Sequence, residues 1–216
     1  MPQLNPQAAR GNVSVRHERE EDLKTATLLG TLVFVLVCAF SFEVCGPGWR
    51  ADLPGYTNGD DLVRPEGYQE WIFLTSVLHM GAQSSGEGAF VNVFVTPSAY
   101  HQFLASGNWP DKTVFVEEKR TSLSRVSKTE HFQTDLIGLN VQVKDVARFA
   151  EKWAFFSFGF SQKTAKANPK ATCWQCHDEH GAVDATYVQL YSTLKPAAKK
   201  FGTYPLDLEG PYASQY

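Results

Sequence analysis

The middle of the chain is a succession of short stretches rich in β-branched and aromatic residues, and this pattern constrains the fold more than any other feature. Such stretches, bounded by Gly, Pro, Asn and Asp, are typical of β-strands. The connections between them are short, which favours an antiparallel sheet over βαβ units. Five strands are expected, at residues 70–80, 89–96, 113–120, 136–143 and 153–160.

Two segments are expected to be helical. Pro97 opens a short helix that ends at Gly107, because Pro is tolerated in the first helical turn and Gly favours the end of a helix. After Cys173 the pattern turns helical again, and residues 183–199 contain apolar residues at mixed spacing with Pro196 near the end. The predicted fold class is therefore α+β, a mainly antiparallel β-sheet with short helices and a C-terminal helical segment.

The beginning of the chain divides by composition. Residues 1–24 are polar and charge-rich, whereas residues 25–42 carry no charged residue and are long enough to cross a bilayer. Basic residues precede this run, and the next one after it is Arg50, so the positive-inside rule places residues 1–24 in the cytoplasm and the remainder outside. The run is either a cleaved signal peptide or a retained membrane anchor, with a buried core helix as the remaining alternative.

Residues 43–67 are rich in Gly, Pro, Asn and Asp, and we expect a linker there. The linker would lead into one domain at residues 68–216. Export places this domain in the periplasm, free or anchored to the inner membrane.

Composition limits the partners of the chain. Its formal net charge of −3 leaves no electrostatic footprint for nucleic acid, so none is expected as a partner. The chain contains 15 Phe, 8 Tyr and 5 Trp. Such an aromatic content suits a site that surrounds a large flat apolar group, although an ordinary aromatic core has the same composition.

Cys173, Trp174, Gln175, Cys176 and His177 form a C-x-x-C-H sequence, the attachment motif of c-type haem. One turn of backbone lets the two sulfurs add to the two haem vinyl groups, and the adjacent histidine then points its imidazole at the iron. We therefore predict one covalent haem c held by Cys173 and Cys176, with His177 as the metal ligand. The predicted export agrees, because this attachment takes place on the outer side of the bacterial membrane.

Other chemistry uses similar cysteine pairs. A C-x-x-C redox disulfide needs a thioredoxin-like βαβ context, which the strand pattern lacks. A structural zinc site needs about four ligands, and only His180 lies near the motif as a further candidate. A disulfide framework that also uses Cys38 and Cys45 is disfavoured by the spacing.

The opposite face of the iron has no evident protein ligand in the sequence. Nothing places a nitrogen or sulfur donor across from His177, and each candidate is explained more simply as an ordinary surface or core residue. We therefore expect an open sixth position. The candidates are Met80, His79, His101, His131 and His180.

Several short pieces stand in a fixed order before the haem motif. They are Tyr68-Gln69-Glu70-Trp71, residues 93–97 with Tyr100, Gly107 and Asp111 before residues 113–116, residues 137–139 with 143–145, Arg148-Phe149 and Trp153-Ala154-Phe155. With these pieces, the chain from about Tyr68 to Lys199 resembles the cytochrome P-460 and cytochrome c′-beta family.

The resemblance implies a homodimer with a mainly antiparallel sheet and a five-coordinate haem whose distal pocket faces the sheet. One branch of the family oxidises hydroxylamine and links a sheet lysine covalently to the porphyrin. The other branch lacks that link, has a more apolar pocket and binds gases such as nitric oxide.

Three polar positions of the hydroxylamine-oxidising pocket are replaced in this chain. The cross-linking lysine falls on Glu117, which cannot form the same bond, the expected arginine falls on Val91, and the distal carboxylate falls on Asn140. These assignments depend on strand register, because a slip of one residue exchanges the faces of a strand. The phenylalanines expected to wall the pocket are Phe90, Phe94, Phe115 and Phe155.

Lys119 shares a strand face with Glu117 and lies about 6.6 Å further along the strand. It either reaches the haem edge or pairs with Glu117 or solvent, as charges on strand surfaces usually do. The leading function is therefore a haem protein that binds nitric oxide or another small gas. The alternatives are an oxidoreductase for hydroxylamine or nitrogen oxides, with Glu117 as its acid-base group, and an electron-transfer cytochrome with a partner cytochrome.

Overall fold

The computed structural model describes residues 52–80, 88–124 and 130–209. All of them belong to one compact unit, which comprises Asp52–Tyr216. The predicted tail and the hydrophobic run at residues 1–24 and 25–42 lie outside the described residues. In the part of the chain that is described, no helix is long and apolar enough to cross a membrane.

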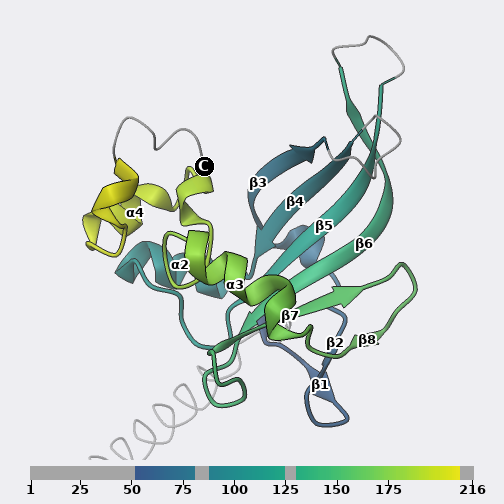
Figure 1. Ribbon diagram of the computed structural model, residues 1–216, viewed down its shortest axis with the longest axis horizontal. Helices are drawn as coiled ribbons and strands as arrows, with labels where there is room; N and C mark the ends of the chain where they lie inside the picture. Colours follow the sequence, from purple (N-terminus) through teal and green to yellow (C-terminus); the bar gives the residue numbers. More distant parts are fainter. Residues whose placement is uncertain (1–51, 81–87, 125–129, 210–216) are drawn as a thin grey trace, which may run out of the picture. The chain divides into compact units, whose positions relative to one another are not determined.

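Five antiparallel strands form the main sheet, and each pairs with the next one along the chain (Figure 1). This arrangement confirms the predicted α+β class and all five predicted strands. The strands are β3 (Ile72–His79), β4 (Ala89–Val95), β5 (Val114–Leu123), β6 (Phe132–Lys144) and β7 (Trp153–Phe158). β5 and β6 run further than predicted, because they continue to pair with each other beyond their apolar parts, as far as Leu123 and Phe132.

A second, small sheet contains part of the segment that was predicted to be a linker. Its strands are β1 (Tyr56–Thr57), β2 (Asp61–Val63) and β8 (Thr164–Ala165), in the order β1-β2-β8. The linker prediction is wrong from residue 52 onward, because Leu62 is only 1% exposed and belongs to a core. Asn58 and Gly59 both have positive φ (48° and 85°), so the turn residues close a hairpin instead of a linker.

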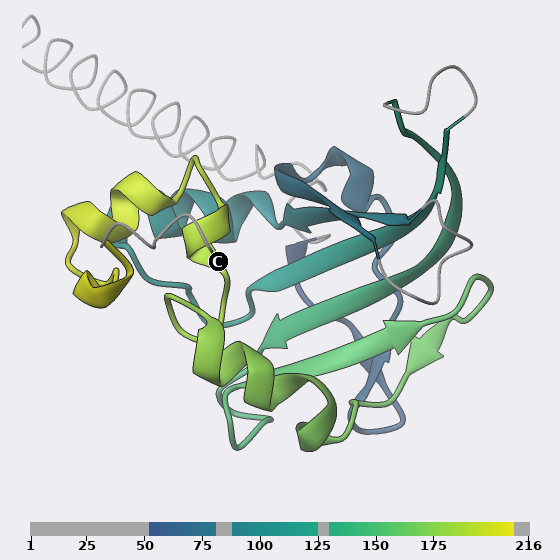
Figure 2. The same cartoon turned by 45° about the horizontal axis from the view of Figure 1, so that its top comes forward.

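Helical segments are short and lie beside the main sheet (Figure 2). The predicted helix at Pro97 is confirmed, and it ends at Gly107 with left-handed backbone. The prediction of helix over residues 183–199 is wrong in part, because Asp184 and Ala185 have positive φ (49° and 56°) and cannot continue a right-handed helix. The helices are α2 (Pro97–Ser106), α3 (Lys170–His180) and α4 (Lys195–Lys200), with 3-10 turns η2 (Tyr68–Glu70), η3 (Val188–Leu190) and η4 (Leu206–Glu209).

Each face of the main sheet carries its own hydrophobic core. The first joins β4 and β5 to α2, α4 and η3, and it contains the adjoining rings of Phe103, Trp109 and Phe115, whose centroids are 4.2 and 4.8 Å apart. The second joins the opposite face to the small sheet through Leu62 and Phe156. Burial on both faces explains why β4 (AFVNVFV) and β7 (WAFFSF) are nearly continuous apolar runs.

β5 places two adjacent carboxylates on opposite faces of the sheet. Glu118 is buried on the face of the second core, where Tyr68 Oη donates to it at 2.6 Å and Asn92 Nδ2 at 3.1 Å, and Arg120 pairs with it. Burial by itself would raise the pKa of Glu118, but these hydrogen bonds outweigh burial and lower it. Glu118 is therefore a structural anion, and Glu117 faces the other side.

The core position of β2 yields a prediction about residues 52–67. Replacing buried Leu62 with Ala should lower the free energy of unfolding by about 2–5 kcal/mol, the usual cost of a leucine-sized cavity. The adjacent Val63, which is 42% exposed, is the matched control, and Val63→Ala should change the value by no more than about 0.5 kcal/mol. Urea unfolding measures both, and equally small effects would mean that this segment does not belong to the cooperative unit.

Candidate functional site

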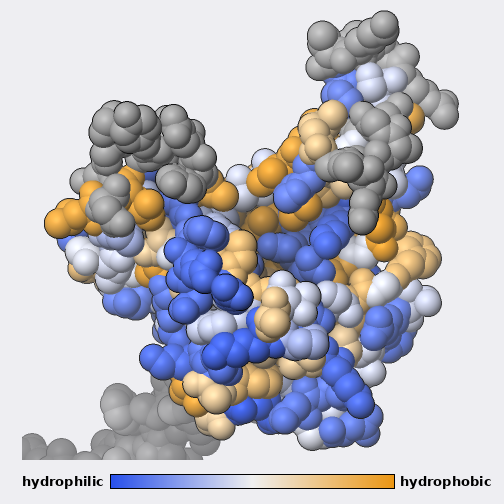
Figure 3. Space-filling view, in the orientation of Figure 1, coloured by the Kyte–Doolittle hydropathy of each residue, from blue (hydrophilic) through white to orange (hydrophobic). Residues whose placement is uncertain are grey.

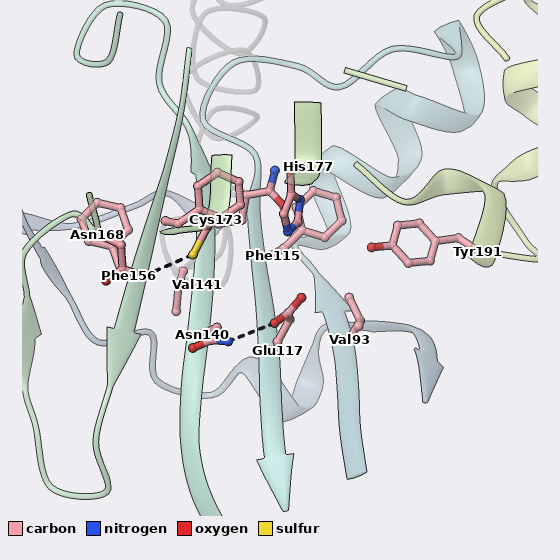
Figure 4. A pocket seen from close by; sticks show the side chains of 12 residues that line it. Val93, Phe115, Glu117, Asn140, Val141, Phe156, Asn168, Cys173, His177 and Tyr191 are labelled. Atoms are coloured by element: carbon pink, nitrogen blue, oxygen red, sulfur yellow. Dashed lines mark hydrogen bonds between the residues drawn. The ribbon is translucent and has the colours of Figure 1, made fainter. Parts of the chain in front are cut away.

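α3 carries both cysteines of the C-x-x-C-H motif and its histidine. The helix begins at Lys170, directly after Pro169, so it is already established when the chain reaches Cys173. Residues three and four apart share a helix face, which groups Cys173, Cys176 and His177 together. Both thiols are free, with Cys173 half-buried and Cys176 exposed. α3 lies against β7, and the close view in Figure 4 shows Cys173 and His177 turned toward the sheet.

The imidazole of His177 is held in one orientation. Its Nδ1 lies 3.0 Å from the carbonyl oxygen of Ala185, and its ring packs 4.6 Å from Phe155 and 4.8 Å from Tyr187. Because a carbonyl only accepts hydrogen bonds, Nδ1 carries the proton and Nε2 keeps a lone pair. Burial lowers the pKa of His177, and the bond to Ala185 opposes this shift without outweighing it. The result is a neutral imidazole with Nε2 available to a metal.

The Ala185 carbonyl is itself positioned by buried side chains. Gln142 on β6 donates to it through Nε2 at 3.1 Å. The hydroxyl of Thr186 donates to the Val183 carbonyl at 2.6 Å and accepts a hydrogen bond from Trp109 Nε1 at 2.8 Å. No sequence motif singles out these residues, because their task is to orient a backbone carbonyl in a turn.

A small cavity of about 50 Å³ separates His177 from the sheet, and a larger one of about 520 Å³ adjoins it. The two cavities share Val93, Glu117, Asn140 and Tyr191 as lining residues. Figure 3 shows apolar surface in the recess between the helical segments and the far ends of the sheet strands. The remaining lining of the small cavity is Phe115, Val141, Gln142, Phe155, Phe156, Asn168, Cys173 and His177. That of the larger cavity is Thr75, Val77, His79, Ala89, Val91, Lys119, Tyr187 and Leu190.

The cavity side of the main sheet consists of rows of cross-strand neighbours. We name three of them by their β5 residue, the Phe115 row, the Glu117 row and the Lys119 row. The Phe115 row is apolar apart from one amide, the Glu117 row is mainly polar, and the Lys119 row has one charge. In strand order from β4, the rows are Val95, Phe115, Gln142 and Phe155; Val93, Glu117, Asn140 and Ser157; and Val91, Lys119 and Gly138.

Glu117 is the acidic group of the cavity. Its carboxylate points toward the space beneath His177 (Figure 4) and accepts a hydrogen bond from Asn140 Nδ2 at 3.2 Å. Asn140 Oδ1 in turn accepts from Ser157 Oγ at 3.1 Å, and Ser157 Oγ accepts from Asn168 Nδ2 at 3.0 Å. A chain of hydrogen bonds thus connects Glu117 with the exposed hydroxyl of Ser157.

The structure separates the four phenylalanines that were expected to wall the pocket. Phe115 and Phe155 line the small cavity. Phe94 lies on the other face, with its ring centroid 5.7 Å from those of both Tyr68 and Phe73. Phe90 lies on that other face as well, because residues two apart on a strand share a face. The expectation is therefore wrong for Phe90 and Phe94, since Val91 and Val93 take the cavity side of β4.

The candidate sixth ligands lie away from the His177 cavity. His131 bonds to Ser122 Oγ at 2.9 Å, His101 stacks edge-on with Tyr100 on α2, and Met80 is 63% exposed beyond β3. His180 is exposed at the end of α3, and His79 lines only the larger cavity. In the described part of the chain, no three His, Cys, Asp or Glu residues form a group that could hold a metal ion such as zinc.

These features fit a haem. Two thiols and an imidazole with a free Nε2 occupy one helix face, and an aromatic and aliphatic recess lies beneath them. A C-x-x-C-H motif on one helix, with the histidine Nε2 available to iron, is characteristic of the class of c-type haem proteins.

The comparison with protein families gives the particular family. The model of the family "Cytochrome P460" matches residues 65–188, more than half of the chain's 216 residues. The chain belongs to the cytochrome P460 family and is a c-type haem protein, as the sequence resemblance predicted. A comparison with curated proteins finds no match.

The support of the Ala185 turn can be tested through Thr186. Thr186→Val leaves the indole N–H of Trp109, a residue only 2% exposed, without an acceptor, which should cost about 1–3 kcal/mol of unfolding free energy. Thr172→Val on the exposed side of α3 is the control and should change stability by no more than about 0.5 kcal/mol. Denaturant unfolding measures both, and an unchanged Thr186→Val protein would show that this bond does not support the turn.

Proposed function

We propose that this chain carries one haem c between α3 and the main sheet and binds a small nitrogen-oxide ligand, such as nitric oxide, on the side that faces the sheet. Cys173 and Cys176 form the thioether bonds, and His177 is the axial ligand. The observation that carries the proposal is the lining of the His177 cavity, which among the described residues contains no second histidine and no methionine or lysine. No side chain of these types from the described part of the chain lines that cavity to compete with an external ligand for the iron.

The attachment follows from the chemistry of the thiols. Each thiol adds across one vinyl double bond, so that sulfur bonds to one vinyl carbon, the proton goes to the other, and no oxidant is consumed. The exposed Cys176 and half-buried Cys173 lie on the same helix face as His177 and can act on one cofactor together.

The walls of the site favour small uncharged ligands. Phe115, Phe155 and Val93 present apolar surface, and burial raises the pKa of Tyr191, which keeps its hydroxyl neutral. The haem supplies the iron that coordinates the ligand, and the chain supplies the imidazole, the apolar walls and the restricted access. Polarity and access of the distal side decide between binding and activation of a ligand.

We also propose that the protein acts in the periplasm as a homodimer and exchanges electrons with a partner cytochrome. The charge asymmetry around residues 25–42 supports export or anchoring, and the family resemblance supports dimerisation. Cell fractionation and sedimentation analysis test the two claims separately.

Optical titration with nitric oxide tests the main proposal. The purified holoprotein should show a high-spin c-type spectrum that shifts with one equivalent of nitric oxide, and its haem should stay with the polypeptide on a denaturing gel. The Cys173→Ser, Cys176→Ser double variant is the control and should lose the covalent haem. A resting low-spin spectrum that does not change on addition of nitric oxide would contradict the proposal and favour an electron-transfer cytochrome.

A second candidate function is oxidation of hydroxylamine or a related nitrogen-oxide compound, and Glu117 favours it. The Glu117 carboxylate faces the cavity, so it can accept a proton from an N–H or O–H group of a substrate held there. The hydrogen-bonded chain through Asn140 and Ser157 leads from this carboxylate to the surface. The electrons of the oxidation would pass to an external acceptor, the partner cytochrome.

Glu117→Gln separates this function from simple gas binding. The amide keeps the shape of the side chain but cannot accept the proton, so turnover of hydroxylamine should fall by at least about 100-fold while haem attachment stays complete. Glu70→Gln, at an exposed position in η2, is the matched control and should keep full turnover. Undiminished turnover in Glu117→Gln would rule out Glu117 as the base.

A further inference from the structure

We infer that Lys119, assisted by His79, binds the two carboxylates of the haem and so fixes the orientation of the cofactor over the sheet. The inference rests on the proposed attachment at Cys173 and Cys176 and assigns a role to the larger cavity. Neither the sequence motif nor the family match assigns this role to these residues.

The direction of the cofactor follows from its chemistry. A haem carries its two vinyl groups on one side of the ring and its two propionate carboxylates on the other. With the vinyl side bonded to the cysteines and the iron at His177, the carboxylates lie beyond the iron. The small cavity holds Cys173 and His177, and the larger cavity continues from it past Glu117 and Asn140.

Lys119 and His79 lie in the larger cavity, where the haem carboxylates would be placed. Lys119 is two residues beyond Glu117 on the same strand face, a distance of about 6.6–6.8 Å along β5. Lys119 is the cross-strand neighbour of Val91. His79 is the neighbour of Ala89, which stands two residues before Val91 on the same face of β4. Both side chains line the larger cavity.

Charge makes this assignment specific. Lys119 and His79 are the only basic residues among the described residues that line the larger cavity, and most of the other lining side chains are apolar. Two carboxylates placed there need a cation, because an unpaired charge against apolar surface is costly. Arg120 cannot serve, since it points to the opposite face and pairs with Glu118.

Lys119 is a half-buried cation for which the described residues offer no partner. Some lysines of the domain pair with acids, as Lys112 does with Asp145 and Lys144 with Asp184. The acid nearest to Lys119 on its own strand face is Glu117, and its carboxylate is bonded by Asn140 instead. Of the alternatives for Lys119, the ion pair with Glu117 is therefore not formed, and the ammonium group remains available to an anion.

A cation beside the haem carboxylates has a measurable consequence. The oxidised iron carries one more positive charge than the reduced iron, so a nearby cation disfavours the oxidised form and raises the reduction potential. Removing the cation also leaves the negative charge of the carboxylates unopposed, and this charge favours the oxidised iron and lowers the reduction potential as well. Lys119→Gln should therefore lower the reduction potential of the holoprotein.

The test compares four holoprotein variants by reduction potential, by the resonance Raman band of the haem propionates and by intact mass. Lys119→Gln should lower the potential and shift the propionate band, and Lys119→Arg should restore both. His79→Gln should produce a smaller change in the same direction. Lys166→Gln, at an exposed site outside both cavities, should leave the potential and the band unchanged.

The outcomes distinguish failure of this inference from failure of the proposed function on which it rests. An unchanged potential and propionate band in Lys119→Gln, with haem attached and nitric oxide still bound, would overturn the inference alone. A peptide mass that shows Lys119 bonded covalently to the porphyrin would also overturn it, because that amine could no longer act as a carboxylate-binding ammonium. Absence of covalent haem from the unaltered protein would overturn the proposed function instead.

Discussion

The hydrogen bond from His177 Nδ1 to the Ala185 carbonyl organises the functional side of this protein. It sets the tautomer of the imidazole, leaves Nε2 free and aims it at the sheet. The carbonyl can accept this bond because Asp184 and Ala185 adopt left-handed backbone, a conformation that is costly for residues other than glycine. Gln142 on β6 and Thr186 in the turn stabilise that conformation through hydrogen bonds to the Ala185 and Val183 carbonyls. Metal-binding histidines are commonly oriented in this way by a second hydrogen bond.

The two faces of β5 divide structure from chemistry. Glu118 is buried in a satisfied network with Tyr68 and Asn92, which ties the central strands to the second core. Glu117, one residue earlier, belongs to the cavity and has only Asn140 as a hydrogen-bond partner among the described residues. Because successive side chains of a strand point to opposite faces, two identical residues acquire different roles. The rows that contain Phe115, Glu117 and Lys119 then place apolar surface, a carboxylate and an ammonium group in succession along the recess.

Much of the fold could be predicted from local patterns. All five strands of the main sheet and the helix at Pro97 follow from residue type, spacing and turn signals, since these are properties of short segments. The predictions from sequence are wrong where the same residue types are compatible with two different structures. The composition around Asn58 and Gly59 predicts a linker, but these residues close the β1–β2 hairpin, in which β2 pairs with β8 and Leu62 is buried. Phe94 was placed in the pocket because it is aromatic, whereas the register gives that place to Val93.

The amino-acid sequence alone specifies the family, the α+β class and the motif of Cys173, Cys176 and His177. The motif and the strands depend on residues that are close together in the chain, and the family depends on the order of short pieces along residues 65–188. Only the tertiary structure reveals what surrounds that motif. The Ala185 carbonyl, Gln142 and the Glu117–Asn140 pair reach the site from separate elements, and their contacts depend on strand register and on a strained turn. A shift of one residue in register would exchange every cavity side chain of a strand for its neighbour. The burial of particular side chains in the folded protein excludes that shift, and the local sequence pattern does not exclude it as strongly.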